Sequence, residues 1–367
     1  MASALVIGAG LIGTSVALAL SGRGVRVYLR DADPIAARTA AALGAGTTDT
    51  PSGPADVALL AVPPGQVVSV LASAQAAGLA HVYTDVASVK GLPLRASIAA
   101  GCDVASFVGG HPMAGRELSG PVAAQPDLFA GRPWILTPLP ETSPEALRVV
   151  RETIQLCGAT PVEMAATEHD EAMALVSHTP HLVSAVMAAR LVDVEPYVAR
   201  LAGQGLRDVV RIAGGGSQLW TDILAANATA VADVLDGLAE DLRSTISALR
   251  DIGSGTHRAS GAVAALTDLL DRGRTGHRVL PGKHGTPQEP CEDVHVVIGD
   301  MPGELAQCLA AVGAAGVNVE DMELDQNPGR ASGTVRLQVS AAAAAVLPTV
   351  LNELGWKAHG GTTAAEK

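Results

Sequence analysis

The first 165 residues alternate short apolar runs with longer stretches in which apolar residues recur every three or four positions. Such alternation predicts a doubly wound parallel sheet with helices on both faces. The predicted strands are Ala4–Ile7, Val25–Leu29, Val57–Val62, Val82–Asp85, Ser106–Gly109, Trp134–Thr137 and Thr160–Met164. The predicted helices are Leu11–Ser21, Pro34–Leu43, Gln66–Ala77, Leu92–Ala99 and Pro144–Leu156. We therefore expect an α/β domain over residues 1–165.

From residue 166 the spacing becomes helical and strand signals are few. The predicted helices are Glu168–Val192, Glu195–Ala202, Ser217–Asn227 and Ala230–Arg250. One apolar face runs along the last of them, through Val231, Val234, Leu235, Leu238, Leu242, Ile246 and Leu249. Long apolar helices outside a sheet usually pack on one another, often between subunits. We therefore expect an all-α domain over 166–282 that forms a homodimer.

A third pattern follows a segment rich in structure breakers. Arg272–Pro290 contains four Gly and three Pro, which is typical of a linker, and we place the linker itself at 283–292. Beyond it the pattern predicts the strands Val294–Ile298, Val317–Leu324 and Thr334–Val339, and the helices Pro302–Ala315 and Ala341–Leu354. This β-α-β-β-α order, with room for a short further strand at Trp356–Ala358, predicts a ferredoxin-like α+β domain over 293–360. Residues 361–367 are expected to be a disordered tail.

Composition and charge narrow the classes of function. The net charge of −12 argues against nucleic-acid binding, which requires a basic face. The four cysteines form no C-x-x-C pair, so no metal site or disulfide framework is expected. Met1–Gly22 carries no charge, but it lacks the positive start of a signal peptide and four glycines interrupt it. We expect a cytoplasmic protein with no membrane partner.

A glycine-rich turn joins the first predicted strand to the first predicted helix. Glycines spaced in this way permit a tight turn and the close approach of a pyrophosphate, which meets the free N–H groups of the helix N-terminus. An acid at the end of the second strand holds ribose hydroxyls. The pattern predicts a Rossmann dinucleotide-binding domain whose cofactor contacts are Gly8, Gly10, Leu11, Ile12, Gly13 and Asp31. Asp31 favours NAD, and the neighbouring Arg30 keeps NADP as the alternative.

Two polar motifs lie where the fourth and fifth predicted strands end. Ser88 lies in the segment Asp85–Lys90, and His111 begins the segment His111–Gly115. Open α/β sheets bind ligands at the carboxyl ends of their strands. A serine and a histidine at this edge could hydrogen-bond each other and a substrate hydroxyl. A structural histidine that holds a loop is an equal alternative for His111.

The helical domain contributes two histidines and an arginine. His178 and His181 lie three residues apart and so on one helix face. They fit a metal pair, but no third ligand is evident, and a packed or solvated pair is commoner. Arg211 lies in a mostly apolar stretch, which indicates an anionic partner, either a ligand or a nearby Asp or Glu.

Taken together, these motifs resemble the prephenate dehydrogenases of tyrosine biosynthesis. The resemblance runs in order over residues 1 to about 285. It rests on Gly8-x-Gly10-x-x-Gly13, Asp85-x-x-Ser88-Val89-Lys90, His111-Pro112-Met113-Ala114-Gly115, Ser177-His178-x-Pro180-His181 and Arg207-Asp208-x-x-Arg211-Ile212-Ala213. Residues 293–360, with Asp300–Leu305 and Gly316–Val319, resemble an ACT domain, a small amino-acid-sensing module.

The resemblance implies an oxidative decarboxylation. Prephenate loses a hydride from C4 to NAD and CO2 from C1, which gives 4-hydroxyphenylpyruvate. By resemblance, His111 accepts the C4 hydroxyl proton, Ser88 orients that hydroxyl and His111, and Arg211 binds a substrate carboxylate. The further substrate-binding residues that it implies are His178, His181, Trp220, Arg207 and Arg116.

One departure from the family pattern bears on the substrate. Arg116 stands where the family often has Thr, and a cation there favours prephenate, with its keto acid, over arogenate, with its ammonium group. Arg116 could equally point into water or pair with Glu117. Arogenate dehydrogenase therefore stays as the alternative.

Two other classes compete. The β-hydroxyacid dehydrogenases use a lysine of their helical domain, and this chain has none between Lys90 and Lys283. A non-catalytic NAD-binding regulator would not need the set of Ser88, His111 and Arg211.

The ACT resemblance implies an amino-acid effector. ACT modules typically pair and bind the amino acid between the loop before their first helix and the strand that follows. Gly303 in that loop and Asn318 on the facing segment are the expected effector contacts. Tyrosine, the end product, is the expected effector, and a purely structural domain is the alternative.

Overall fold

The computed structural model describes residues 1–115, 118–255, 259–280, 291–326 and 332–361. The chain divides into two compact units, Met1–Ala239 and Glu240–Lys367. The predicted tail at 361–367 lies outside the described residues, apart from residue 361.

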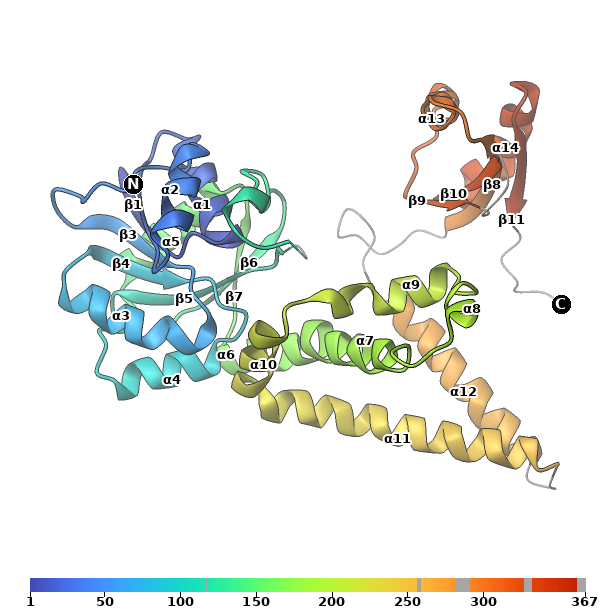
Figure 1. Cartoon of the computed structure of the whole chain (residues 1–367), viewed down its shortest axis with the longest axis horizontal. Coiled ribbons are helices and arrows are strands. Elements are labelled where there is room, and N and C mark those ends of the chain that lie inside the picture. Colours follow the sequence, from blue (N-terminus) through green and yellow to red (C-terminus); the bar gives the residue numbers. More distant parts are fainter. Residues whose placement is uncertain (116–117, 256–258, 281–290, 327–331, 362–367) are drawn as a thin grey trace. The chain divides into compact units, whose positions relative to one another are not determined.

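A seven-stranded sheet forms the centre of the N-terminal part (Figure 1). Its strands are β1 (Ser3–Ile7), β2 (Arg26–Arg30), β3 (Ala55–Leu60), β4 (Ala80–Asp85), β5 (Phe107–Pro112), β6 (Pro133–Thr137) and β7 (Thr160–Glu163). Their order is β2-β1-β3-β4-β5-β6-β7. All neighbours are parallel except β5 and β6, which run antiparallel. The predicted doubly wound sheet is confirmed, with this one reversal.

Helices cover both faces of the sheet. They are α1 (Leu11–Ser21), α2 (Pro34–Ala42), α3 (Val67–Ala76), α4 (Gly91–Ala99) and α5 (Pro144–Leu156). Side chains alternate along a strand, so Ala4 and Val6 of β1 join the core under α1 and α5, whereas Leu5 joins the core under α3 and α4. Two separate apolar cores result, and they hold the carboxyl ends of the strands in place.

The segment after β7 is helical, as expected. Its helices are α6 (Ala166–Met173), α7 (Thr179–Ala189), α8 (Pro196–Ala199), α9 (Gln204–Arg211), α10 (Ser217–Ala226) and α11 (Ala228–Gly253). The single helix predicted over Glu168–Val192 is interrupted by a π-helical turn at Ala174–His178. Pro180 at the start of α7 explains the interruption, because proline donates no N–H and its ring clashes with the carbonyl four residues earlier.

The run Ala166–Ala189 is apolar and long. By length and composition alone it is the one candidate membrane span among the described residues, which is weak evidence. His169, His178 and His181 lie in this run and are almost completely buried within the chain. Their burial places this run against other parts of the protein.

The predicted linker is partly wrong. Helix α12 spans Ala259–His277 and so includes the first residues of Arg272–Pro290. Arg272 pairs with Asp268 four residues earlier and with Asp241, and these ion pairs support the helix despite its glycines. Strand β8 begins at Cys291, inside the expected linker 283–292, and residues 281–290 are not described.

The last part of the chain forms a β-α-β-β-α-β unit. Its elements are β8 (Cys291–Gly299), α13 (Glu304–Ala314), β9 (Asp321–Gln326), β10 (Ser332–Ser340), α14 (Ala341–Glu353) and β11 (Lys357–Gly361). The sheet order is β11-β8-β10-β9, and every pairing is antiparallel. A separate apolar core lies between the sheet and its helices. The ferredoxin-like prediction is confirmed, although β9 begins later than Val317.

Candidate active site

The turn between β1 and α1 has the shape of a dinucleotide-binding loop. A Cβ on Gly8, whose φ is 107°, would lie 2.2 Å from the carbonyl oxygen of Ala61. A Cβ on Gly13 would lie 1.9 Å from the carbonyl oxygen of Gly8. By contrast, a Cβ on Gly10 would meet nothing within 4 Å. Gly8 and Gly13 are therefore required by packing, whereas Gly10 faces open space.

The N-terminus of α1 suits an anion. Gly10 precedes the helix without a side-chain cap, and the first turn carries no acidic residue. Its N–H groups are therefore available to a phosphate. Leu11 and Ile12 begin the helix and pack against the core below, so they reach a cofactor through their backbone. These features fit the pyrophosphate of a dinucleotide.

Asp31 lies directly after β2. Its Oδ2 accepts the N–H of Ala9 at 2.6 Å, and its Oδ1 accepts the N–H of Asp33 at 2.8 Å. These bonds fix the carboxylate beside the glycine turn, and each oxygen keeps further acceptor capacity. This geometry fits a ribose with free hydroxyls.

A buried ion pair joins the ends of β4 and β5. The Lys90 ammonium group donates to the carboxylate of Asp85 and to the carbonyl oxygen of Gly110, and Asp85 accepts the N–H of Gly110 at 3.0 Å. Both ionic side chains are about 1% exposed. These contacts fix the backbone just before His111.

His111 and Ser88 both lie at this edge of the sheet. His111 is half-buried near the end of β5, and Ser88 is half-buried in the loop after β4. No hydrogen bond joins the two side chains in the described part of the chain. The expected Ser88–His111 pair is thus not formed, although both lie at the predicted edge.

His111 is hydrogen-bonded to a histidine of the helical segment. Its Nδ1 lies 2.9 Å from Nε2 of His169, and Nδ1 of His169 lies 2.9 Å from Oδ1 of Asp170. Burial and the nearby His169, Lys90 and His178 hold the pKa of His111 well below its usual value near 6.5. His111 is therefore a neutral proton acceptor at neutral pH.

Asn227 determines the proton position on His178. The Asn227 side-chain Nδ2 donates to the carbonyl oxygen of Asp170 at 2.7 Å, so the 3.1 Å contact from Nδ2 to His178 Nδ1 is also a donation. Burial lowers the pKa of His178 to about 4. Neutral His178 thus carries its proton on Nε2, which is buried and has no partner in the described structure. His178 is a donor without an acceptor.

Aromatic rings pack beside this donor. The rings of His181 and Trp220 are stacked with centroids 3.5 Å apart, and Trp220 lies edge-on to His178 at 6.3 Å. Burial lowers the pKa of His181 as well. The stack on Trp220 orients the His181 ring, and the contact with Asn227 orients the His178 ring.

The two arginines lie on α9. Arg207 and Arg211 are exposed, and no residue of this helix is buried. Arg116 lies outside the described residues. The structure therefore gathers the predicted histidines and Trp220 into one region and leaves Arg207 and Arg211 on a surface helix.

Sequence reasoning gave no role to three residues of this region. They are His169, Asp170 and Asn227. His169 and Asp170 lie in the polar run Glu168–Glu171, which gives no local signal that sets them apart from an exposed helical turn. The contact between His111 and His169 joins residues 58 positions apart, so local pattern could not reveal it.

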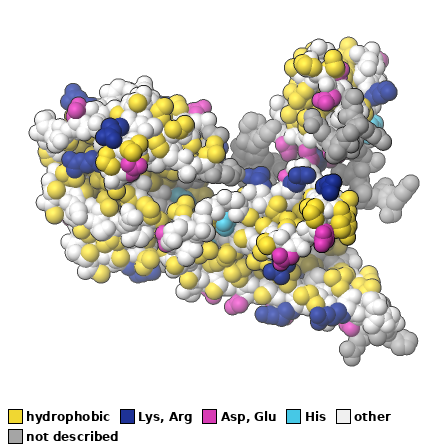
Figure 2. Space-filling model, viewed as in Figure 1, with side chains coloured by type: hydrophobic (Ala, Val, Ile, Leu, Met, Phe, Trp, Pro, Cys, Tyr) yellow, Lys and Arg dark blue, Asp and Glu magenta, His cyan; other side chains and the backbone are white. Residues whose placement is uncertain are grey.

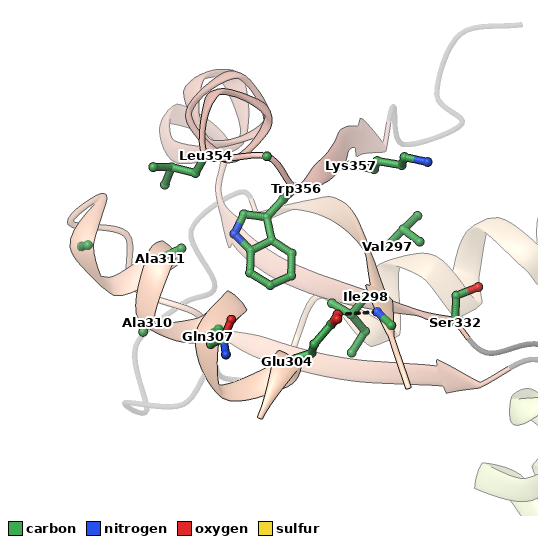
Figure 3. Close-up of a pocket in the computed structure, with 13 residues that line it drawn as sticks. Val297, Ile298, Glu304, Gln307, Ala310, Ala311, Ser332, Leu354, Trp356 and Lys357 are labelled. Carbon is green, nitrogen blue, oxygen red and sulfur yellow. Dashed lines mark hydrogen bonds between the residues drawn. The ribbon is translucent and has the colours of Figure 1, made fainter. Parts of the chain in front are cut away.

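The expected effector contacts lie in the C-terminal unit. Gly303, with φ 93°, precedes α13, and exposed Asn318 donates its side-chain amide to Glu320 at 2.7 Å. A groove of about 790 Å³ adjoins α13 and contains neither residue. Figure 3 shows the Trp356 indole over this groove, facing Gln307 and Glu304. Glu304 accepts the N–H of Gly299 at 2.6 Å.

Comparison with known proteins decides the family. Residues 16–163 match the model of the prephenate dehydrogenase nucleotide-binding domain, and residues 165–256 match that of the prephenate dehydrogenase dimerization domain. The chain is 40% identical over 361 residues to the Probable prephenate dehydrogenase NovF of Streptomyces niveus, covering 98% of this chain and 100% of NovF. The chain belongs to the prephenate dehydrogenase family. The match to NovF extends through the C-terminal unit.

The chain is also similar to a second curated protein and to solved structures. The prephenate dehydrogenase of Bacillus subtilis is 28% identical over 345 residues, covering 91% of each chain. The structure of Aquifex aeolicus prephenate dehydrogenase with hydroxyphenyl propionate and NAD+ has a TM-score of 0.64 and 26% identity, covering 75% of this chain and 98% of that one. Synechocystis arogenate dehydrogenase has a TM-score of 0.56 and 26% identity, covering 73% of this chain and 99% of that one.

Proposed function

We propose that this protein oxidises and decarboxylates prephenate to 4-hydroxyphenylpyruvate, with NAD as the acceptor. The observation that carries the proposal is His111, a half-buried neutral imidazole at the carboxyl edge of a dinucleotide-binding sheet, in a chain of this family. The reaction requires one proton acceptor and orientation of the substrate, because aromatisation of the ring supplies the driving force.

The cofactor residues proposed are Gly8, Gly10, Leu11, Ile12, Gly13 and Asp31. The helix N–H groups would hold the pyrophosphate, and Asp31 would hold ribose hydroxyls. When bound, NAD accepts the hydride from C4 of the substrate. Asp31 disfavours the extra phosphate of NADP by charge repulsion, and Arg30 is the residue that would tolerate it.

His111 accepts the proton of the C4 hydroxyl as the C4–H bond breaks. The C1–carboxylate bond then breaks, CO2 leaves, and its electron pair completes the aromatic ring. The proton returns from His111 to the phenolic oxygen, so the product is 4-hydroxyphenylpyruvate. Ser88, at the same edge, orients the hydroxyl group.

The remaining residues would bind the substrate. Arg211 is the proposed carboxylate ligand, because its planar fork matches a carboxylate, and Arg207 and Arg116 are the further cationic candidates. His178 offers a buried N–H that lacks an acceptor, which suits an anionic or carbonyl oxygen. The stacked rings of His181 and Trp220 form a flat aromatic surface that suits a six-membered ring.

The experiment is a spectrophotometric assay of purified protein with prephenate or arogenate, each with NAD or NADP. We expect the prephenate and NAD pair to give NADH, CO2 and 4-hydroxyphenylpyruvate in equal amounts. Turnover of arogenate alone would establish the alternative substrate, which the similarity to Synechocystis arogenate dehydrogenase supports. NAD binding without turnover of either substrate would favour a non-catalytic regulator.

We further propose a cytoplasmic homodimer built from three domains, 1–165, 166–282 and 293–360. Exposed apolar side chains on α7 and α11 support pairing through the helical part, and Figure 2 shows hydrophobic side chains on its visible face. Val186 is 64% exposed and Leu242 is 54% exposed. Such surfaces commonly mark subunit contacts.

Tyrosine is the proposed effector of the C-terminal domain. Gly303 and Asn318 flank α13, and the neighbouring groove carries the polar groups of Gln307 and Lys357 beside the Trp356 ring. This combination suits a ligand with a charged end and a ring. Regulation requires that tyrosine bind one arrangement of the protein better than another.

A further inference from the structure

An unbroken line of hydrogen bonds leads from His111 into the helical segment. It passes through His169, which is 0% exposed, to the carboxylate of Asp170, which is 9% exposed. We infer that His169 and Asp170 are positioning residues that hold His111 in the tautomer whose Nε2 atom is free to accept a proton. The catalytic consequence of this tautomer rests on the proposed function, whereas the assignment of the tautomer itself rests only on the hydrogen bonds.

The proton positions follow from the carboxylate. Asp170 accepts hydrogen bonds, so Nδ1 of His169 donates its proton to Oδ1. A neutral histidine carries one N–H, and Nε2 of His169 is therefore an acceptor. Nδ1 of His111 must then donate across the 2.9 Å contact. This leaves the lone pair of His111 on Nε2.

Asp170 is itself held in place from three sides. Its Oδ1 accepts the N–H of Lys90 at 2.8 Å, its Oδ2 accepts the N–H of Gly91 at 2.8 Å, and His169 is the third donor. Burial alone would raise the pKa of Asp170, but the bonds from His169, Lys90 and Gly91 lower it overall. The ionised carboxylate therefore persists at neutral pH and keeps its orienting role.

The same chain assists the proton transfer. When His111 takes up a proton it becomes a cation, and burial, His169, Lys90 and His178 all oppose that charge. The negative Asp170, hydrogen-bonded to the far side of the His169 ring, reduces this opposition. The hydrogen bonds through His169 to Asp170 thus fix His111 as the acceptor before the reaction and stabilise its protonated form afterwards.

A purely structural role predicts a different outcome. Asp170 also joins α6 to the N-terminus of α4, and a simple clamp would account for its backbone contacts. Loss of a clamp lowers stability and weakens every ligand, but it leaves the pH profile of kcat and the tautomer of His111 unchanged. The two roles are therefore separable by measurement.

The test compares Asp170→Asn with the control Leu94→Ala. An amide at position 170 carries no negative charge and has one acceptor oxygen in place of two. With its NH2 group toward His169 it donates to Nδ1, which reverses each hydrogen bond from His169 to His111 and places a proton on Nε2 of His111. Leu94, buried in α4, belongs to an apolar core and takes no part in the hydrogen bonds that join His111, His169 and Asp170, so its truncation destabilises the same helix without changing those bonds. Thermal unfolding, NAD binding, kcat and KM across pH are measured for both full-length variants and the wild type.

We expect Asp170→Asn to lower kcat by about 10²–10⁴, as loss of a correctly placed acceptor does, with NAD affinity unchanged and the acid limb of kcat shifted. Leu94→Ala should lower the melting temperature and keep the wild-type pH profile. A kcat of Asp170→Asn equal to that of Leu94→Ala at matched stability would overturn the inference.

Nitrogen-15 NMR of histidine-labelled wild type tests the tautomer without substrate. A proton on Nδ1 of His111, absent in Asp170→Asn, is the expected result. A proton on Nε2 of wild-type His111 would refute the inference, whatever the enzyme turns over. Failure of the proposed function would appear separately, as a wild-type protein that turns over neither substrate.

Discussion

The hydrogen-bonded residues His111, His169 and Asp170 differ from helix α9 in how far they are buried. His111, His169 and Asp170 are hydrogen-bonded to one another, and backbone N–H groups fix the last of them. Helix α9 carries Arg207 and Arg211 but buries no residue. A buried, bonded group keeps one geometry, whereas an exposed helix is oriented by what it contacts. We infer that the proton acceptor is set before substrate binds and that the arginines adjust to the substrate.

The largest effect is expected at the acceptor. His111→Asn removes the imidazole near the end of β5, which is the proposed proton acceptor, and keeps a side chain of similar size. We expect kcat to fall by about 10²–10⁴, with NAD affinity unchanged. Steady-state kinetics and calorimetry with NAD check this. A kcat near that of the wild type would remove His111 from the mechanism.

Buried His178 should also make the free energy of unfolding sensitive to acid. His178 has a folded-state pKa of about 4 against an ordinary 6.5, so the unfolded chain takes up a proton first as the pH falls. The free energy of unfolding is unaffected above pH 6.5 and decreases between 6.5 and 4, by at most about 3 kcal/mol from this group.

His178→Gln should therefore lose less stability on acidification than the wild type. Denaturant unfolding at about pH 7.5 and about pH 5 measures the difference. Arg207→Gln on α9 is the control, and it should follow the wild type. Equal acid sensitivity of His178→Gln and the wild type would show that His178 does not titrate in this way.

Substitutions on the exposed helix α9 should affect substrate binding. Arg211→Lys keeps the charge and loses the bidentate fork, so KM for prephenate should rise by about tenfold while kcat changes little. Arg207→Lys is the matched change on the same helix. An unchanged KM for Arg211→Lys in a folded protein would move the carboxylate contact to Arg207 or Arg116.

The smallest effect on basal turnover is expected from the C-terminal domain. Its apolar core is separate from those of the sheet, so a chain ending at Pro290 should keep its activity without tyrosine. Tyrosine should bind the full chain in calorimetry and inhibit it, and both effects should disappear on truncation. Absence of heat and of inhibition with the full chain at millimolar tyrosine would leave a structural domain.

Sequence pattern predicted the sheet because its strands are short apolar runs separated by helical spacing, as in Ala4–Ile7 and Leu11–Ser21. The sequence pattern predicted the wrong structure in two places. Ion pairs of Arg272 extend α12 past its glycines into the predicted linker. Pro180 interrupts the predicted long helix, which forms a π-helical turn at Ala174–His178. Both depend on contacts that a local pattern does not contain.

The candidate site, too, was predictable from the sequence only in part. Ser88 and His111 were expected at one edge because each follows a strand, and the structure places them there. The roles of His169, Asp170 and Asn227 depend on hydrogen bonds between residues 58, 80 and 57 positions apart. These pairings arise only when the helical segment packs against the sheet edge.

The pH dependence of kcat with prephenate and NAD tests most directly whether neutral His111 accepts the proton. Because burial together with His169, Lys90 and His178 lowers the pKa of His111, the acceptor stays neutral below pH 6.5. We expect kcat of the wild type to hold through pH 6.5 and to fall only well below it, and His111→Asn to lack this acid limb. A midpoint at or above 6.5, or the same limb in His111→Asn, would contradict the account.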